Sequence, residues 1–238
     1  MHPLRKIVRR FGLDVHRFNP FSSDEYRLNH MLSSHGVNLV LDVGANRGQY
    51  ATFLRDAGYR NRIVSFEPQA DMHSLLVRAS SNDPEWTIAH RVALGASRST
   101  VKINLSRNRA ATSLLTPLNR LSNLDPDSTD FIGAESVQIV PLDEAASLYI
   151  SGSERMFLKL DVQGFEGPVL DGAVEVVGRA VGLQVEMTFV ALYDGQALFE
   201  DLYRRVTAAG FTLWTILQGF CDMSSGRSHQ CDFVFFRD

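Results

Sequence analysis

The sequence predicts an α/β fold, in which a parallel sheet carries helices on both faces. Short apolar runs alternate with segments of helical periodicity between residues 37 and 209, which is typical of such a sheet. The first run lies in LVLDVGANRGQY, residues 39–50, where an acid and a glycine turn precede a candidate helix. Two later apolar runs flank a turn rich in glycine, serine and aspartate. They predict an antiparallel hairpin at the sheet edge.

Size and composition fit one folded domain with additions. The chain has 238 residues, of which 45% are hydrophobic and 21% charged, so a disordered or fibrous protein is not expected. The net charge of −3 provides no chain-wide cationic field, and no nucleic-acid partner is predicted. No run of about 18 apolar residues occurs, so no segment is expected to span a bilayer. Cys221 and Cys231 lack CxxC spacing, which favours a cytoplasmic location, with a late disulfide as the alternative.

Residues 1–36 are expected to form a helical extension, and residues 37–238 the main domain. The start, MHPLRKIVRRFGLDVHRF, alternates basic and apolar residues. It fits either a solvated helix over one edge of the domain or an amphipathic segment in weak contact with an anionic membrane. A signal peptide is not predicted, because arginine interrupts the short apolar stretch. Ser22 and Glu25 predict a capping box for a helix that ends at Gly36.

Strands and helices then follow in alternation. The predicted strands are residues 37–43, 62–66, 86–94, 100–105, 137–140, 156–162 and 181–187. The predicted helices are residues 47–57, 71–79, 166–173 and 196–209, and the hairpin strands are residues 211–217 and 232–237. The polar stretch from residue 106 to residue 135 is too long for an ordinary connection, so we expect it to cover the substrate.

The turn after the first strand is the strongest single indication of a ligand site. A strand, a glycine turn and a helix start bring free main-chain N–H groups to the edge where ligands of open α/β sheets bind. Glycine is expected there because a Cβ would block the approach of the ligand. Gly44 and Gly48 form GANRG, which is neither GxGxxG nor a Walker loop. Tight packing of the strand against the helix therefore stays an alternative.

Two acids are predicted to face the same crevice. Glu67 ends the next strand, where a carboxylate can accept hydrogen bonds from both hydroxyls of a ribose. A solvated acid at the end of a strand is the alternative. Asp161, in LKLDVQGFE at residues 158–166, repeats the strand–acid–glycine arrangement of the first strand. It either faces the crevice or caps the following helix.

These motifs resemble those of the FkbM family of S-adenosylmethionine-dependent methyltransferases. LDVGANRGQY is similar to the cofactor loop of the family, SFEP to its ribose-binding strand end, VALG to its adenine-side segment and LKLDVQGFE to its second signature. The resemblance covers residues 38–187. It implies a class I methyltransferase Rossmann-like fold with seven strands, the last pair antiparallel, S-adenosyl-L-methionine as cofactor and O-methylation as the usual activity. Gln163 departs from the glutamate that is more frequent in the family, so a role that needs charge there is not carried over.

The resemblance also implies roles for individual residues. The methionine part of the cofactor would lie among Asp42, Gly44, Ala45, Asn46, Gly48 and Tyr50. Glu67 would hold the ribose, and the adenine would be bordered by Pro68, Gln69, Val92 and Ala93. Asp161 would lie near the sulfonium and the acceptor.

The resemblance to this family also implies that the acceptor is a sugar hydroxyl in a glycolipid, a saccharide or a related natural product. A hydroxyl needs a group that takes its proton. Asp161 is the first candidate for this base and Glu186, at the end of the strand LQVEM, is the second, although Glu186 could equally cap a loop. Ser113, Gln163 and His229 are the expected substrate contacts, with a surface role as the alternative for His229. No metal is predicted, because the histidines lack ligand spacing.

Two other classes of function stay open. A nicotinamide-dependent oxidoreductase would share the strand, the turn and the ribose-binding acid, but it would normally have GxGxxG. A non-catalytic domain that binds partners through the basic start would not retain the cofactor. The oligomeric state is not predicted.

Overall fold

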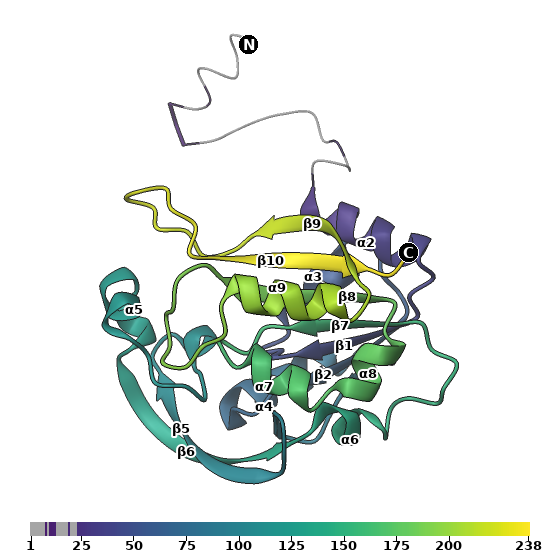
Figure 1. The fold of residues 1–238 in the computed structure, drawn as a ribbon, viewed down its shortest axis with the longest axis horizontal. Coiled ribbons are helices and arrows are strands. Elements are labelled where there is room, and N and C mark those ends of the chain that lie inside the picture. The colour runs from purple at the N-terminus through teal and green to yellow at the C-terminus, as the bar shows by residue number, and fades with distance from the viewer. Residues whose placement is uncertain (1–7, 9, 13–18, 20–22) are drawn as a thin grey trace.

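The computed structural model describes residues 8, 10–12, 19 and 23–238. Its centre is a seven-stranded sheet with the strand order β3-β2-β1-β7-β8-β10-β9, flanked by helices on both faces (Figure 1). The strands are β1 (Leu39–Val43), β2 (Arg62–Phe66), β3 (Trp86–Ile88), β7 (Met156–Leu160), β8 (Gly182–Thr188), β9 (Thr212–Gln218) and β10 (Gln230–Phe236).

The first five strands of this sheet are parallel, and β10 runs antiparallel to both β8 and β9. The predicted class I methyltransferase fold, with its hairpin at the sheet edge, is therefore confirmed. All five residues of β1 and of β7 are buried, as expected for central strands with helices on both faces.

A second, three-stranded sheet was not expected. It has the order β4-β6-β5 and consists of β4 (Ala93–Leu94), β5 (Ser99–Ser106) and β6 (Phe131–Val140). The single strand predicted for residues 86–94 is divided between the two sheets, because β2 ends at Phe66 and offers no partner beyond Ile88. The stretch at residues 106–135 also contains short helices, which are η2 (Arg109–Ala111), α5 (Asn119–Leu124) and η3 (Pro126–Ser128).

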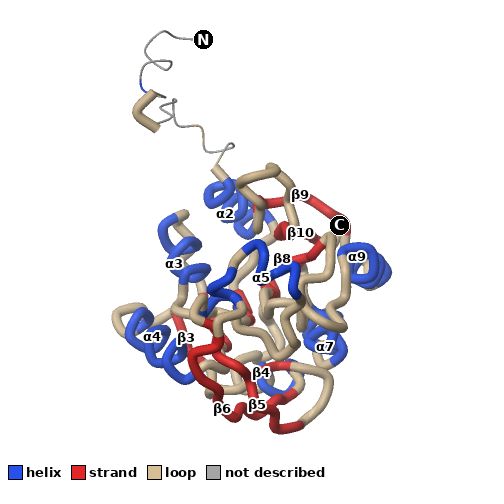
Figure 2. Tube along the Cα trace, turned by 90° about the vertical axis from the view of Figure 1, so that its left-hand side faces the viewer, coloured by secondary structure: helices blue, strands red, loops and turns tan. Residues whose placement is uncertain are grey.

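Helices cover the two faces of the large sheet. Figure 2 shows α3 and α4 on one side and α7 and α9 on the other. The bounds are α2 (Asp24–Ser34), α3 (Gln49–Asp56), α4 (Ala70–Ser80), α6 (Leu142–Ala146), α7 (Glu166–Asp171), α8 (Val174–Arg179) and α9 (Phe199–Ala208). The short helices α6 and α8 were not predicted, since five or six residues carry little periodic signal.

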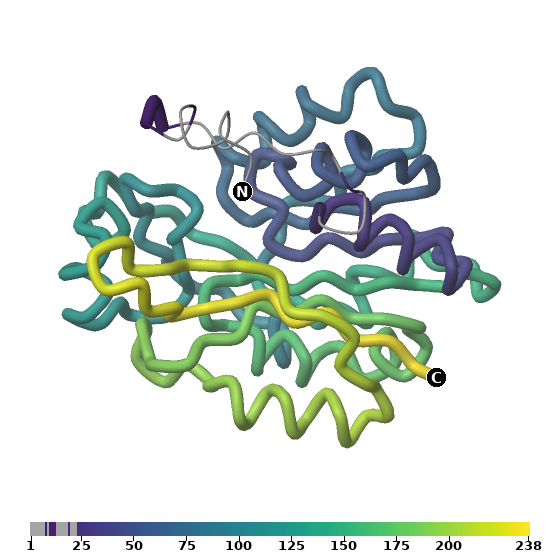
Figure 3. The backbone as a smooth tube through the Cα atoms, turned by 90° about the horizontal axis from the view of Figure 1, so that it is seen from above, coloured from purple at the N-terminus to yellow at the C-terminus, as the bar shows by residue number. Residues whose placement is uncertain are grey.

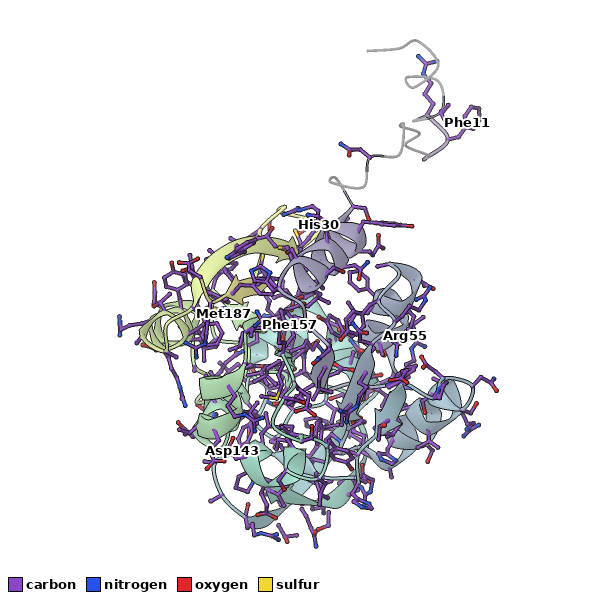
Figure 4. The ribbon with its side chains drawn as sticks, turned by 90° about the vertical axis from the view of Figure 1, so that its right-hand side faces the viewer. Phe11, His30, Arg55, Asp143, Phe157 and Met187 are labelled. Atoms are coloured by element: carbon purple, nitrogen blue, oxygen red, sulfur yellow. The ribbon has the colours of Figure 1, made fainter. Side chains whose placement is uncertain are left out.

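Each face of the sheet has its own apolar cluster. Phe157 belongs to the cluster under α2 and α3, and Met187 to the cluster under α7, α8 and α9; both lie inside the molecule in Figure 4. The hairpin end is also anchored, because Phe220 packs against the cluster around Leu121 of α5, and Figure 3 shows that end of the hairpin beside residues 106–130.

Helix α2 of the N-terminal extension packs on the sheet. Leu28 and Leu32 of α2 are fully buried. The helix begins after Ser23, whose hydroxyl donates to Glu25, so the capping box predicted at Ser22 is not the observed arrangement; Ser22 itself lies outside the described residues. Most of the basic start predicted to contact a membrane also lies outside them. Within the described residues, no helix is long and apolar enough to cross a bilayer.

Candidate active site

A cavity of about 390 Å³ lies at the carboxyl ends of the parallel strands. This is the edge at which open α/β sheets bind their ligands. The predicted residues that line it are Gly44, Ala45, Asn46, Tyr50, Glu67, Pro68, Gln69, Val92, Ala93, Ser113, Asp161 and Gln163. The predicted residues that do not line it are Asp42, Gly48, Glu186 and His229.

The turn between β1 and α3 needs glycine for a reason other than ligand access. Gly44 and Gly48 have φ values of +82° and +95°, which favour glycine. A Cβ on Gly44 would lie 1.8 Å from the carbonyl oxygen of Asp161, and a Cβ on Gly48 would lie 2.6 Å from the ring of Trp86. The expectation that a Cβ would obstruct the ligand is thus replaced by the close packing of the turn against protein.

Glu67 joins the ends of the first two strands. Its Oε2 accepts from the main-chain N–H of Asn46 and its Oε1 from that of Gln69, each at 2.8 Å. The side chain is 2% exposed, and this burial raises the pKa of Glu67 to about 7. The carboxylate is therefore fixed in orientation at the wall of the cavity.

Lys159 is a central residue that the sequence motifs did not indicate. It is 4% exposed, and its Nζ lies 3.2 Å from Asp161 Oδ2 and 3.5 Å from Asp42 Oδ1. Burial alone would lower the pKa of Lys159, but the carboxylates of Asp161 and Asp42 raise it by more than burial lowers it. The ammonium therefore stays charged. It also lies 5.2 Å from the ring centroid of Tyr50. A lysine inside an apolar strand, two residues before Asp161, is the signal that could have revealed it.

Asp42 lies behind the cavity rather than in its lining. It is fully buried, and its Oδ2 accepts from the hydroxyl of Ser65 at 3.0 Å. The indole N–H of Trp86 donates in turn to that hydroxyl oxygen at 2.9 Å. Asp42 therefore pairs with the ammonium of Lys159 on the side that faces away from the cavity.

Gln163 connects two carboxylates. Its Nε2 donates to Asp161 Oδ1 at 2.8 Å and to Glu186 Oε2 at 3.1 Å. Its main-chain oxygen accepts from the hydroxyl of Ser113 at 2.6 Å, and its φ is +54°, which is uncommon for a residue with a side chain. Burial raises the pKa of Glu186 well above its ordinary value, and the charges of Asp161 and Glu166 add to this effect.

Glu166 fixes the loop that carries Gln163. Its Oε1 accepts from the main-chain N–H groups of Val162 at 2.9 Å and Gly164 at 3.2 Å. The side chain is 1% exposed, and burial raises the pKa of Glu166 to about 7. The acid thus holds Asp161 and Gln163 in place from outside the cavity.

His229 is not brought to these groups. It is 5% exposed, and its ring lies 5.9 Å from that of Phe220 in the hairpin turn. Burial lowers the pKa of His229. Among the residues that the structure describes, no three histidines, cysteines or acids are arranged to hold a metal ion.

Comparison with known families is decisive for the class of protein. A family model described as the methyltransferase FkbM domain matches residues 42–213, which is more than half of the chain. The chain belongs to this family. As an FkbM methyltransferase it uses S-adenosyl-L-methionine as its methyl donor, and of the classes left open by the sequence the methyltransferase is the one supported.

Solved structures with a similar arrangement are distant in sequence. Magnesium protoporphyrin IX methyltransferase from Synechocystis PCC 6803 with bound SAM is 11% identical, with 98% of this chain and 90% of that chain covered and a TM-score of 0.49. An O-methyltransferase from Bacillus cereus in complex with SAH is 11% identical, with coverages of 98% and 88% and a TM-score of 0.49. An rRNA methylase from Streptococcus thermophilus is 12% identical, with coverages of 94% and 99% and a TM-score of 0.47. No curated protein sequence matches the chain.

Proposed function

We propose that this FkbM methyltransferase transfers the methyl group of S-adenosyl-L-methionine to a hydroxyl of a sugar in a glycolipid, a saccharide or a related natural product. The observation that carries the proposal is the pair of carboxylates, Asp161 and Glu186, bridged by the amide of Gln163; of the two, Asp161 lines the cavity. Such a pair suits an acceptor that must lose a proton.

The cavity lining fits the cofactor. Each oxygen of Glu67 accepts one main-chain N–H, and a carboxylate oxygen has a second lone pair, so both can also accept from ribose hydroxyls. Pro68, Gln69, Val92 and Ala93 border the place of the adenine, and Gly44, Ala45 and Asn46 border that of the methionine part. Asp42 and Gly48 support this turn from behind instead of touching the cofactor.

Asp161 is the proposed general base. When bound, the cofactor supplies an electrophilic methyl group, and the chain must align the hydroxyl and receive its proton. Asp161 lines the cavity and Glu186 does not, so Asp161 is the better placed of the two to receive the proton. Lys159 lies 3.2 Å from Asp161 Oδ2 and keeps that carboxylate oriented. Base assistance of this kind is typically worth about 10² to 10⁴ in rate.

An acceptor screen tests the proposal. Purified protein and methyl-labelled donor are incubated with cell-wall glycans, glycolipids, lipid extracts and RNA. We expect label in a saccharide fraction, and loss of this label in Asp161→Asn with S-adenosylhomocysteine binding retained. Label in RNA alone, or full transfer by Asp161→Asn, would contradict the proposed acceptor or the proposed base respectively.

A further inference from the structure

The cavity extends well beyond the place proposed for the cofactor. Neighbouring strands lie about 4.8 Å apart, so β2 and β10, four positions apart in the sheet, are separated by roughly 19 Å. Glu67 directly follows β2 and Asp161 directly follows β7, yet the lining continues past both onto β8, β9, β10 and the helices α2 and α3. We call this end of the cavity the distal arm. Its lining residues are Asp24, Gln49, Tyr50, Phe53, Lys159, Gln184, Leu217, Gln218 and Asp232.

The floor of the distal arm is polar where a sheet of this kind is normally apolar. Lys159 of β7 and Gln184 of β8 are paired in register, and Asp232 of β10 lies opposite Glu186, two residues further along β8. Gln184 is 3% exposed, and its Oε1 accepts from the hydroxyl of Tyr50 at 2.9 Å. Among the residues that the structure describes, Asp232 Oδ1 has no hydrogen-bond partner. A buried polar atom without a hydrogen bond is costly, so the unpaired Oδ1 of Asp232 indicates a polar ligand.

The wall of the distal arm is aromatic. Tyr50 and Phe53 of α3 have ring centroids 6.1 Å apart and ring planes at 15° to one another. Both side chains are half-buried and line the cavity. Two nearly parallel rings offer flat apolar contact, and the planar carboxylate and amide groups of Asp232 and Gln218 in the same lining accept and donate hydrogen bonds at defined angles. A ring that bears several hydroxyls combines both requirements.

The charges of the distal arm argue against an anionic ligand. Asp24 and Asp232 supply two carboxylates, while the one cation in the described part of the lining is Lys159, which is already paired with Asp161 and Asp42. A phosphate group would therefore meet negative charge without a free cation, and nucleic-acid backbones bind through such cations. An uncharged ring avoids this repulsion.

We infer that the distal arm binds an uncharged sugar ring of the methyl acceptor, with Tyr50 and Phe53 against one face of the ring and Asp232 and Gln218 bonded to its hydroxyls. The inference rests on the proposed function and adds the place and the residues of acceptor binding. It assigns the acceptor to α3 and the hairpin strands, away from residues 106–135 and from His229. It also gives the N-terminal extension a role, because Asp24 belongs to α2.

Saturation-transfer NMR on the full chain loaded with S-adenosylhomocysteine tests the inference, with methyl glycosides of mannose, rhamnose and glucose as probes. We expect at least one glycoside to bind, and its affinity to fall at least about fivefold in Asp232→Asn and in Gln218→Ala. The first variant replaces one carboxylate oxygen and the negative charge by an N–H donor, and the second removes the amide. Gln218 is exposed, so its variant keeps the test valid if Asp232→Asn does not fold. Asp201→Asn is the matched control, since Asp201 lies on α9 and is 70% exposed.

The cofactor measurement separates two kinds of failure. Loss of S-adenosylhomocysteine binding by the wild-type protein would count against the proposed function as a whole. Retained cofactor binding with no glycoside signal, or with a signal that survives both arm variants, would overturn the distal arm alone. Tighter binding of an RNA oligonucleotide that competes with the glycosides would overturn it as well.

Discussion

Gln163 bonds to two carboxylates through a single amide nitrogen, which an ionised glutamate at the same position could not do. We expect Gln163→Glu to lower methyl transfer by about tenfold or more near pH 8 and by less near pH 6, since only the protonated acid can donate to Asp161 or Glu186. The pH profile of kcat, measured on the acceptor found in the screen, checks this.

Gln163→Met is the control for this pH effect, because methionine has similar length but neither charge nor an N–H donor. It should lower kcat about equally at both pH values. A profile of Gln163→Glu that runs parallel to that of the wild type would show that the amide does not position the two carboxylates.

The protonation of Glu166 makes the stability of the folded chain depend on pH. Its pKa is raised from 4.5 to about 7, so the folded state holds a proton that the unfolded state releases. The stabilising effect is complete below about pH 4.5 and is lost as the pH rises through about 7, at a cost of up to roughly 3 kcal/mol. Glu166→Gln keeps an oxygen for Val162 and Gly164 and has no charge to bury. It should remove most of this loss.

Urea unfolding at about pH 5 and about pH 8 measures the difference, which should shrink by about 1–3 kcal/mol in Glu166→Gln. Glu175→Gln is the matched control, because Glu175 is exposed on α8. If the free energy of unfolding of Glu166→Gln changed with pH as much as that of the wild type, other buried acids would be the cause of the pH dependence.

At the level of elements, the predictable parts are those with one continuous signal. The strand at 62–66 and the turn after β1 follow from short apolar runs, one followed by Glu67 and Pro68 and the other by a glycine turn. The outer half of β6 was missed because the side chains of residues 131–134 are exposed and show no alternation. Lys159 was missed because hydropathy averages one charge into an apolar strand. Cavity residues such as Gln184 and Asp232 meet only through strand pairing, which a local pattern does not contain.

The N-terminal segment gives a prediction at this scale. The alternation of arginine and apolar residues in residues 1–20 suits an anionic membrane surface, and the described residue Phe11 is 79% exposed. We expect the full chain to sediment with vesicles that contain phosphatidylglycerol and to release them at high salt. A chain that lacks residues 1–20 should stay in solution. Equal sedimentation of both chains would exclude this segment as the membrane contact.

At the scale of the whole molecule, the proposed cofactor site links segments far apart in the sequence. The residues proposed to surround the cofactor come from the ends of β1, β2 and β7 and from the segment before β4. A ligand bound there should stabilise the entire fold, because it binds the folded chain only. At a concentration 100 times Kd the stabilisation is about 2.7 kcal/mol, which corresponds to roughly 5–10 °C in Tm for a chain of this size.

We therefore expect S-adenosylhomocysteine to raise Tm by roughly this amount, measured by calorimetry, and Glu67→Gln to abolish most of the shift. In this variant the side-chain NH₂ group would face the main-chain N–H of Asn46 or of Gln69, and both groups are donors. The ribose would therefore lose one of the two carboxylate oxygens that these N–H groups hold in place. Glu200→Gln, at an exposed position on α9, should keep the full shift. A full shift in Glu67→Gln would mean that the ribose lies elsewhere in the cavity, and the distal arm would then have to be reassigned along with it.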